Sequence, residues 1–363
     1  MLIKEIISSL EYWAPRAFQE SYDNSGLLTG NPNVECSGAI ISLDATEEVV
    51  DDAIKANCNL IISHHPILFS GLKSLTGKTY VERTIIKAIQ NGISLYALHT
   101  NLDNIHGGVS FKMGNLLGLK HMRVLKPSAE NLLKLVTYVP VDHLETVCNA
   151  VFNAGGGKIG NYDECSFSVS GTGTFRPNEH AKPFSGSLNK RHSDVESCVE
   201  FLVRKDQSES ILHALKHAHP YEEVAYELIP LYNKNQFVGS GVIGEFDTPV
   251  EYKDLLNIIK QTFGGTVRFT RAPKEKINTL ALCGGSGSFL LETAISQNAD
   301  AYLSSDFKYH QFFDAVDRIF LMDIGHFEGE QFTMNLIQDF LIEKFPTFAA
   351  RLTEHKTNPV LYY

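Results

Sequence analysis

The chain has 363 residues, of which 43% are hydrophobic, and it carries a formal net charge of −10 at pH 7. A single hydrophobic core rarely grows to this length, so more than one domain is expected. The acidic balance argues against nucleic acid as a partner, because affinity for phosphates depends on clustered Lys and Arg, and it favours a small-molecule substrate.

The first residues do not resemble a secretory signal. The segment from Met1 to Leu10 has apolar residues at helical spacing, interrupted by Lys4 and Glu5. No window approaches the roughly 18 uninterrupted apolar residues of a membrane span, so no membrane partner is expected. The cysteines lie far apart without a CxxC pair and are expected to be buried thiols in a reducing compartment. These features predict a cytoplasmic protein.

A first βαβ unit begins at residue 39. An apolar strand from Ala39 to Leu43 is followed by a helix from Glu48 to Ala56 and by the apolar run Leu60 to Ile62. A further strand from Ile93 to Leu98 completes this first half.

A similar unit begins at Leu280. A strand from Leu280 to Cys283 leads through a glycine turn into a helix that ends at Gln297, and the strand Ala301 to Leu303 follows. In a gap-free alignment of the two units, Asn57 falls on Asn298 and Asn59 on Asp300. In the second unit, the next strand, Ile319 to Met322, is followed by His326 and Glu330. In the first unit, the strand Ile93 to Leu98 is followed in the same way by His99 and Asp103. The pattern predicts an α/β protein with two related halves.

Between the halves, from about Leu132 to about Leu231, the pattern changes. The expected order is β-α-β-β-α-β, which fits a ferredoxin-like α+β module inserted into the core fold. The predicted domains are residues 1–128 (first half of the core), 129–234 (insertion) and 235–363 (second half of the core). The elements expected in the insertion are strands at 132–139, 164–170, 197–204 and 223–229 and helices at 141–153 and 208–217.

The pair His64-His65 directly follows the apolar run Leu60 to Ile62. Ligand sites of open α/β sheets gather at the carboxyl ends of such strands. Neighbouring side chains in a regular strand point to opposite faces, but past the strand end two imidazoles can reach two adjacent metal ions. The alternative is a pair of hydrogen-bonded polar residues at a strand terminus.

The next strand ends in the same way, at His99 and Asp103. A carboxylate can bridge two cations, so Asp103 is a suitable partner for the histidine pair. His99 is open to three readings: a metal ligand, a residue that orients Asp103, or an acid/base group. It could also be a histidine that simply caps the strand.

The third cluster contains His326 and Glu330. If the helix begins at His326, the two side chains lie one turn apart on one face and can converge on a metal. Nitrogen and carboxylate donors together suit Zn, Mn or Fe better than Ca or Mg. His and Glu at this spacing are common on solvated helices, so this pair alone is weak evidence for a metal. The three strand-end clusters together favour a metal site.

Two other patterns are weaker. The glycines from Gly284 to Gly287 could hold a phosphate at a helix start, but they lack the established phosphate-loop spacings and favour a plain strand-to-helix turn. His213, His217 and His219 lie near Pro220, where a helix end and a turn explain them better than a metal does.

The motifs together resemble the Nif-three-like dinuclear metal-centre proteins, often named GTP cyclohydrolase I type 2 homologues. The likeness spans residues 1 to 128 and 235 to 363. It rests on Asp23 to Leu28, Ser63 to Pro66, His99 to Asp103, Gly284 to Gly287, Ser304 to His310, and Gly325-His326 with Glu330.

The resemblance implies two divalent ions per subunit, most suitably Zn with Mn or Fe as alternatives, held by His64, His65, Asp103, His326 and Glu330. It also implies a homohexameric toroid and a middle domain like the PII and CutA modules. The chain departs from the family at Ser304-Ser305-Asp306, where the family often has Thr-Gly-Asp. That change puts the backbone geometry near Asp306 in doubt.

Two functions are compatible with this pattern. One is a metal-dependent hydrolase acting on a nucleotide or related small molecule, in which the ions activate water and polarise the scissile bond. The other is a non-catalytic metal-binding or regulatory assembly whose PII-like insertion binds effectors or partners.

Overall fold

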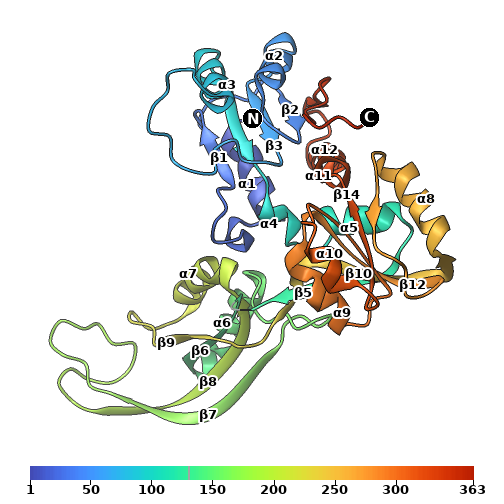
Figure 1. The fold of residues 1–363 in the computed structure, drawn as a ribbon. Coiled ribbons are helices and arrows are strands. Elements are labelled where there is room, and N and C mark those ends of the chain that lie inside the picture. The colour runs from blue at the N-terminus through green and yellow to red at the C-terminus, as the bar shows by residue number, and fades with distance from the viewer. Residues whose placement is uncertain (130) are drawn as a thin grey trace. The chain divides into compact units, whose positions relative to one another are not determined.

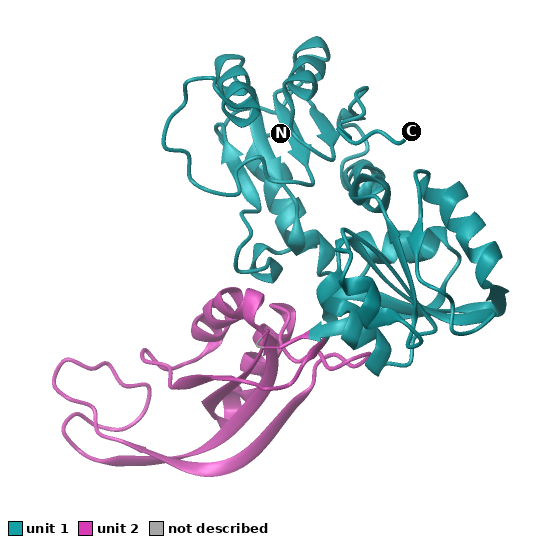
Figure 2. Cartoon of the chain, in the orientation of Figure 1, with its two compact units in different colours: residues 1–127, 236–363 teal, residues 128–235 magenta. Residues whose placement is uncertain are grey.

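The computed structural model describes residues 1–129 and 131–363 and divides the chain into two compact units. One unit comprises residues 1–127 and 236–363, and the other comprises residues 128–235 (Figure 2). We call them the core unit and the inserted unit. Among the described residues no helix is long and apolar enough to cross a membrane.

The first sheet of the core unit has the strand order β1-β4-β3-β2-β15. Strands β2, β3 and β4 are parallel, β1 is antiparallel to β4, and β15 is parallel to β2. Ser42 pairs with Ser63, and Ser63 with Ala97, so the carboxyl ends of the parallel strands are level. The strands are β1 (Gly26–Thr29), β2 (Ala39–Ser42), β3 (Leu60–Ser63), β4 (Ser94–Ala97) and β15 (Ala350–Leu352).

The helices around this sheet follow from the sequence pattern. Thr46 caps α2 by accepting a hydrogen bond from the Val49 amide, and α2 buries Val49, Val50 and Ala53. The helices of this half are α1 (Ile3–Trp13), α2 (Glu47–Lys55), α3 (Tyr80–Gln90), α4 (Thr100–Asp103) and α5 (Val109–Leu116).

The second sheet of the core unit has the order β11-β14-β13-β12-β10-β5. Strands β12, β13 and β14 are parallel, and β11 is antiparallel to β14. Figure 1 labels β10, β12 and β14 of this sheet. The strands are β5 (Lys120–Ser128), β10 (Asn235–Glu251), β11 (Arg268–Phe269), β12 (Lys276–Ser286), β13 (Ala301–Ser305) and β14 (Phe320–Ile324). The helices are α8 (Tyr252–Phe263), α9 (Leu291–Ser296), α10 (Gln311–Ala315), α11 (His326–Glu330) and α12 (Thr333–Lys344).

The two halves of the core unit are related, as predicted. In each sheet three parallel strands follow the same order, and an antiparallel strand lies beside the third. The aligned residues Asn57 and Asn298 both have a left-handed backbone, with φ of 52° and 58°. The amide of Ser94 donates a hydrogen bond to the carbonyl of Asn59. The amide of Phe320 donates a hydrogen bond to the carbonyl of Asp300, the residue aligned with Asn59. The predicted α/β fold is therefore confirmed down to individual turns.

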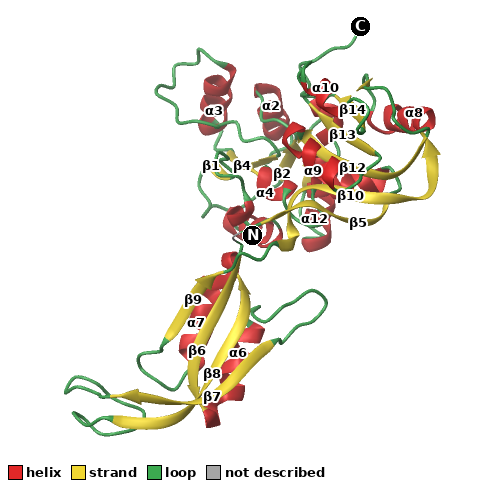
Figure 3. Ribbon diagram, turned by 60° about the horizontal axis from the view of Figure 1, so that its bottom comes forward, coloured by secondary structure: helices red, strands yellow, loops and turns green. Residues whose placement is uncertain are grey.

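The inserted unit has its own sheet, with the order β7-β8-β6-β9, and its own hydrophobic core. Val147 and Val151 of α6 and Ile211 and Leu215 of α7 belong to that core, so both helices pack on one face of the sheet (Figure 3). The elements are β6 (Leu132–Pro140), α6 (Leu144–Asn153), β7 (Ser166–Phe175), β8 (His192–Arg204), α7 (Ser208–Ala218) and β9 (Tyr226–Pro230).

Strands β7 and β8 are longer than the sequence predicted. Their antiparallel ladder continues from Ser166 paired with Phe201 to Phe175 paired with His192. The extra residues include Gly171 and Gly173, which weaken a strand signal in the sequence, but the hairpin partner holds them extended.

The expectation that all cysteines are buried was only partly right. Cys58 and Cys283 are buried, and the other four, all described, are partly exposed free thiols.

Candidate metal centre

Four histidines of the core unit follow the carboxyl ends of parallel strands. His64 and His65 come directly after β3, His99 comes between β4 and α4, and His326 begins α11 after β14. The parallel strands bring these positions to the edge of each sheet, as the sequence predicted.

Each of these histidines is held through its Nδ1 atom. The Nδ1–H groups donate to Leu98 O (from His64, 2.8 Å), Asp44 Oδ1 (from His65, 2.7 Å), Asp23 Oδ1 (from His99, 2.7 Å) and Asp306 Oδ2 (from His326, 2.6 Å). This pattern fixes the ring orientation and turns Nε2, which donates its electron pair once it is deprotonated, towards the cluster, which is how metal-binding histidines are usually supported.

Glu330 lies between two groups of side chains. Its Oε2 atom is 2.9 Å from Nε2 of His65 and 2.9 Å from Nε2 of His326, and these two nitrogens are 3.3 Å apart. Its Oε1 atom is 3.8 Å from Nε2 of His64, which is itself 3.7 Å from Oδ1 of Asp103. Glu330 is thus a carboxylate that faces both groups, and the bridging role predicted for Asp103 stays a prediction.

Two buried atoms of this cluster lack a partner. Among the described residues, no hydrogen bond reaches Nε2 of His64 or Oδ1 of Asp103. A buried polar group without a partner costs about 1–3 kcal/mol. In tetrahedral zinc sites with bonds of about 2.0–2.2 Å, ligand atoms lie roughly 3.3–3.6 Å apart. The 3.3 Å between the Nε2 atoms of His65 and His326 lies in that range, while the two contacts of Glu330 are shorter, at 2.9 Å. The nitrogen and carboxylate donors are those that divalent cations such as zinc bind.

Two groups of possible ligand atoms share His65. One group is His64, His65 and His99, and the other is His65, His326 and Glu330, each with its atoms within 4.8 Å of one another. The structure therefore contains histidine and glutamate groups that could hold a metal. Asp103 lies beside the first group through its contact with His64.

The close approach of histidines and carboxylates shifts the pKa values of the side chains in the cluster. Burial opposes protonation of His65 and His326, but the carboxylates beside them outweigh it and raise the pKa of His65 to about 9 and that of His326 to about 11. Burial, aided by the charge of Glu330, raises the pKa of Asp103 well above its usual range. Burial also acts on Glu330, but the surrounding histidines hold its pKa well below the usual range.

The glycine segment has a different role from the plain turn that the sequence favoured. Strand β12 continues to Ser286, so Gly284 and Gly285 belong to the strand. Gly285 has φ of 62°, and a β-carbon there would lie 2.1 Å from Oε1 of Glu330. Glycine thus leaves the space that the Glu330 carboxylate occupies.

Asp306 is well placed despite the missing glycine. Ser305, which stands where the family often has Gly, continues β13, and its hydroxyl donates to Gly325 O at 3.2 Å. Asp306 itself has φ of 60°. Its Oδ2 atom accepts hydrogen bonds from Ser286 Oγ and from Nδ1 of His326.

Among the described residues, no hydrogen bond joins the His99 ring to Asp103, so the orienting role expected for His99 stays a prediction. Its ring donates to Asp23, whose other oxygen accepts from Thr100 N at 3.0 Å and from the Thr100 hydroxyl. The hydrogen bonds to His99 and Thr100 outweigh burial and lower the pKa of Asp23. The His99 ring centre is 5.4 Å from that of His64 and 5.6 Å from that of His65, so His99 borders the cluster.

A pocket of about 560 Å³ adjoins the cluster. Its lining includes His65, His326, Asp44, Arg268 and Tyr362. Sequence reasoning missed Asp44 as a partner of His65, although Asp44 follows β2 just as the histidines follow their strands. It also missed the segment after β15, which nothing in the local pattern marks as part of a site.

The histidines of the inserted unit do not form a comparable cluster. His219 Nε2 bonds to the carbonyl of Tyr138 at 2.9 Å, and the rings of His213 and His217 stack 6.5 Å apart. Within residues 1–129 and 131–363, the groups able to hold a metal are those of the core unit.

The fold and the site together define the class of protein. The chain is an α/β protein with two related halves, in which strand ends gather histidines and carboxylates suited to a divalent metal. It belongs to the Duf34/NIF3 (NGG1p interacting factor 3) family, whose model matches residues 1–359.

Similar proteins span nearly the whole chain. The GTP cyclohydrolase 1 type 2 homolog of Halalkalibacterium halodurans is 37% identical over 324 residues, which cover 88% of this chain and 87% of that protein. A protein of the same name from Staphylococcus aureus is 33% identical over 349 residues, covering 96% and 94%. The crystal structure of a Bacillus cereus protein related to NIF3 has a TM-score of 0.87 at 33% identity and covers 100% of this chain and 99% of its own. The family resemblance read from the motifs is thereby confirmed.

Proposed function

We propose that the protein is a dinuclear metal-dependent hydrolase of a small molecule, with its ions held by His64, His65, Asp103, His326 and Glu330. The observation that carries the proposal is the arrangement around Glu330. Each oxygen of this one buried carboxylate faces a different group of donors, and each histidine donor is oriented through Nδ1. Such an arrangement supplies ligands for two adjacent ions, with zinc the best fit to the mixed donors and Mn or Fe as alternatives.

Side chains next to the proposed metal ligands hold the ligand rings in position. Asp44 and Asp306 hold the rings of His65 and His326 towards Glu330. Bound divalent ions would supply Lewis acidity and activate water near neutral pH. His99, fixed by Asp23, borders the cluster and is the group that we propose moves a proton between the substrate and solvent.

The substrate would enter through the pocket beside His65 and His326. A volume of about 560 Å³ is within the usual range for a small-molecule site. Relatives carry the name GTP cyclohydrolase 1 type 2 homolog, which makes nucleotides and related heterocycles the first compounds to test.

The experiment is turnover by the metal-free chain and by chains loaded with Zn, Mn or Fe, on a panel of nucleotides and related heterocycles. Hydrolysis that depends on added metal supports the proposal. His99→Gln is expected to retain its metal and lose most turnover, whereas His213→Gln, in the inserted unit, is the matched control and should behave as the parent. Full metal loading without turnover on the panel would instead favour a non-catalytic metal-binding or regulatory protein.

The expected assembly is also part of this proposal. A homohexamer was implied by the family resemblance, and light scattering on the purified chain tests it directly. Six copies of the 40.4 kDa chain are expected in one particle.

A further inference from the structure

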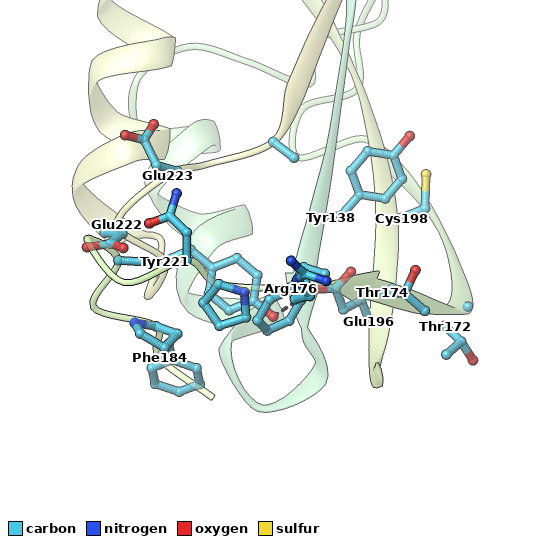
Figure 4. Close-up of a pocket in the computed structure, with 18 residues that line it drawn as sticks. Tyr138, Thr172, Thr174, Arg176, Phe184, Glu196, Cys198, Tyr221, Glu222 and Glu223 are labelled. Carbon is cyan, nitrogen blue, oxygen red and sulfur yellow. Dashed lines mark hydrogen bonds between the residues drawn. The ribbon is translucent and has the colours of Figure 1, made fainter. Parts of the chain in front are cut away.

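The inserted unit contains a pocket that the proposed metal chemistry does not use. It has a volume of about 610 Å³, and its lining includes residues of β7 and β8 (Figure 4). The segment after β7 and the turn between α7 and β9 form its walls. Its lining includes Tyr138, Phe175, Phe184, Glu196, Cys198 and Tyr221.

A buried carboxylate forms part of the pocket. Glu196 on β8 is only 9% exposed. Its Oε1 atom accepts a hydrogen bond of 2.6 Å from the hydroxyl of Tyr221, which fixes the carboxylate. Among the described residues Oε2 has no hydrogen-bond partner, and no Lys, Arg or His forms an ion pair with Glu196. The carboxylate thus offers one free acceptor oxygen at the pocket.

The neighbouring strand β7 has a glycine where the Glu196 carboxylate needs space. Gly171 pairs with Glu196 on the neighbouring strand, and Gly173 lies two residues further on the same face. A β-carbon at Gly173 would lie 2.0 Å from Oε2, whereas one at Gly171 would meet nothing within 4 Å. Any larger residue at 173 would displace the carboxylate.

Aromatic rings line the same pocket. The ring of Tyr221 lies 5.9 Å from that of Phe184 and 6.2 Å from that of Phe175, measured between centres. The faces of such rings attract cations, and the attraction strengthens where water is excluded.

The pocket is held in shape without a ligand. The amide of Lys182 donates to Glu222 at 2.7 Å, and the amide of Asn189 donates to the carbonyl of Pro177 at 2.7 Å. The hydroxyl of Ser185 donates to Asp194 on β8. These bonds tie the segment after β7 to the sheet and to the turn, so a ligand would meet a preformed site.

The charges decide which ligand fits. Among the described lining residues, Glu196, Glu222 and Glu223 are acidic and Arg176 is the one cation. An anion would meet the buried carboxylate of Glu196, and the exposed Glu222 and Glu223 add negative charge at the rim of the pocket. A cation with N–H groups would pair with the free oxygen of Glu196 and lie against the rings.

We propose that this pocket binds a small organic cation, an amine or a guanidine, with Glu196 as its acceptor and Tyr221, Phe175 and Phe184 as its aromatic walls. Binding here supplies the inserted unit with a ligand site of its own. The proposal does not depend on the metal centre, since all of its residues belong to the inserted unit.

The test is calorimetric titration of the full chain with agmatine and spermidine, with glutarate and inorganic phosphate as anionic controls. At least one of the two cations is expected to bind. Glu196→Gln should weaken that binding by about tenfold or more, as expected for loss of a charge-assisted hydrogen bond. Glu200→Gln is the matched control, because Glu200 lies on the same face of β8, pairs with Lys134 and does not line the pocket. It should leave the affinity unchanged.

A second pair of variants covers the case in which Glu196→Gln does not fold. Gly173→Ala displaces the carboxylate without removing its charge and should weaken binding, while Gly171→Ala, with open space around its new methyl group, should bind as the parent does. The proposal is overturned if neither cation binds at about 10 mM, a concentration that would detect even Kd values in the millimolar range. It is also overturned if Glu196→Gln and Gly173→Ala both bind the cation normally, or if phosphate or glutarate binds more tightly.

Discussion

The Nε2 atom of His65 lies 2.9 Å from Oε2 of Glu330, although 265 residues separate the two along the chain. His65 follows a strand of the first sheet and Glu330 ends a short helix after the second sheet. Neither half of the core unit can therefore form the cluster alone. The duplication that gives each half a histidine and an acid at its strand ends is also what allows the halves to complete one site together.

The carboxylate behind His326 should control metal affinity. Asp306→Asn is expected to weaken metal binding by about 10- to 100-fold, because the neutral amide accepts the Nδ1–H bond more weakly and no longer raises the basicity of the ring. The measurement is competition with a chromophoric chelator. Asp314→Asn, on the exposed side of α10, is the control and should leave affinity unchanged. If the two variants bind metal with equal affinity, Asp306 does not support the metal site.

Replacing Gly285 by a larger residue should impair metal binding. Gly285→Ala places a β-carbon 2.1 Å from Glu330 Oε1 and should greatly reduce bound metal. Gly92 has nearly the same φ, 65° against 62°, but a β-carbon there meets nothing within 4 Å. Both variants should lose about 1–2 kcal/mol of stability from the left-handed backbone. Metal analysis separates them: Gly92→Ala should load fully, and full loading of Gly285→Ala would show that the close approach to Glu330 is unimportant.

Metal binding should release protons. Without metal, the pKa of His65 is about 9 and that of His326 about 11, so both are protonated near pH 7 and must deprotonate to coordinate. Affinity should therefore fall as pH is lowered from about 9 towards 7, well above the ordinary histidine range near 6.5. Calorimetric titration with zinc in buffers of different ionisation enthalpy measures the protons released, and about two per chain are expected. A release of zero would mean that these histidines are not ligands.

The inserted unit should be removable. Its core is made of its own residues, and its first and last strands pair, with the amide of Leu231 donating to the carbonyl of Leu132 at 3.0 Å. Deleting residues 129–234 and joining Ser128 to Asn235 by a short Gly/Ser linker should leave a soluble chain with unchanged metal content. The check is metal analysis and gel filtration on several linker lengths. If every version is insoluble or metal-free, the division into domains proposed from the sequence is wrong.

Much of the fold was predictable because parallel strands buried on both faces are continuous apolar runs. Leu60 to Ile62 and Ala301 to Leu303 are such runs, and the side chains just after them mark the site. Strands β1, β5, β10, β11 and β15 were not predicted. Of these, β1, β11 and β15 are short and depend on a partner for their extended form. The positions of Asp44 and Gly285 in the site were also missed, because both act through contacts with residues far along the chain. The central place of Glu330 depends on how the halves pack, which periodicity does not report.

The most direct test of the metal centre is the metal content of two variants of α11, measured by inductively coupled plasma mass spectrometry after zinc loading and dialysis. Glu330 and Glu328 are both buried and lie two residues apart, but Glu328 accepts hydrogen bonds from Asn358 and Tyr362. Among the described residues, Glu328 belongs to neither group that could hold a metal. The account predicts about two zinc ions per chain for the parent and for Glu328→Gln, and a loss of at least one ion for Glu330→Gln, since its carboxylate faces both groups of donors. A Glu330→Gln chain that holds as much zinc as the parent would contradict the account.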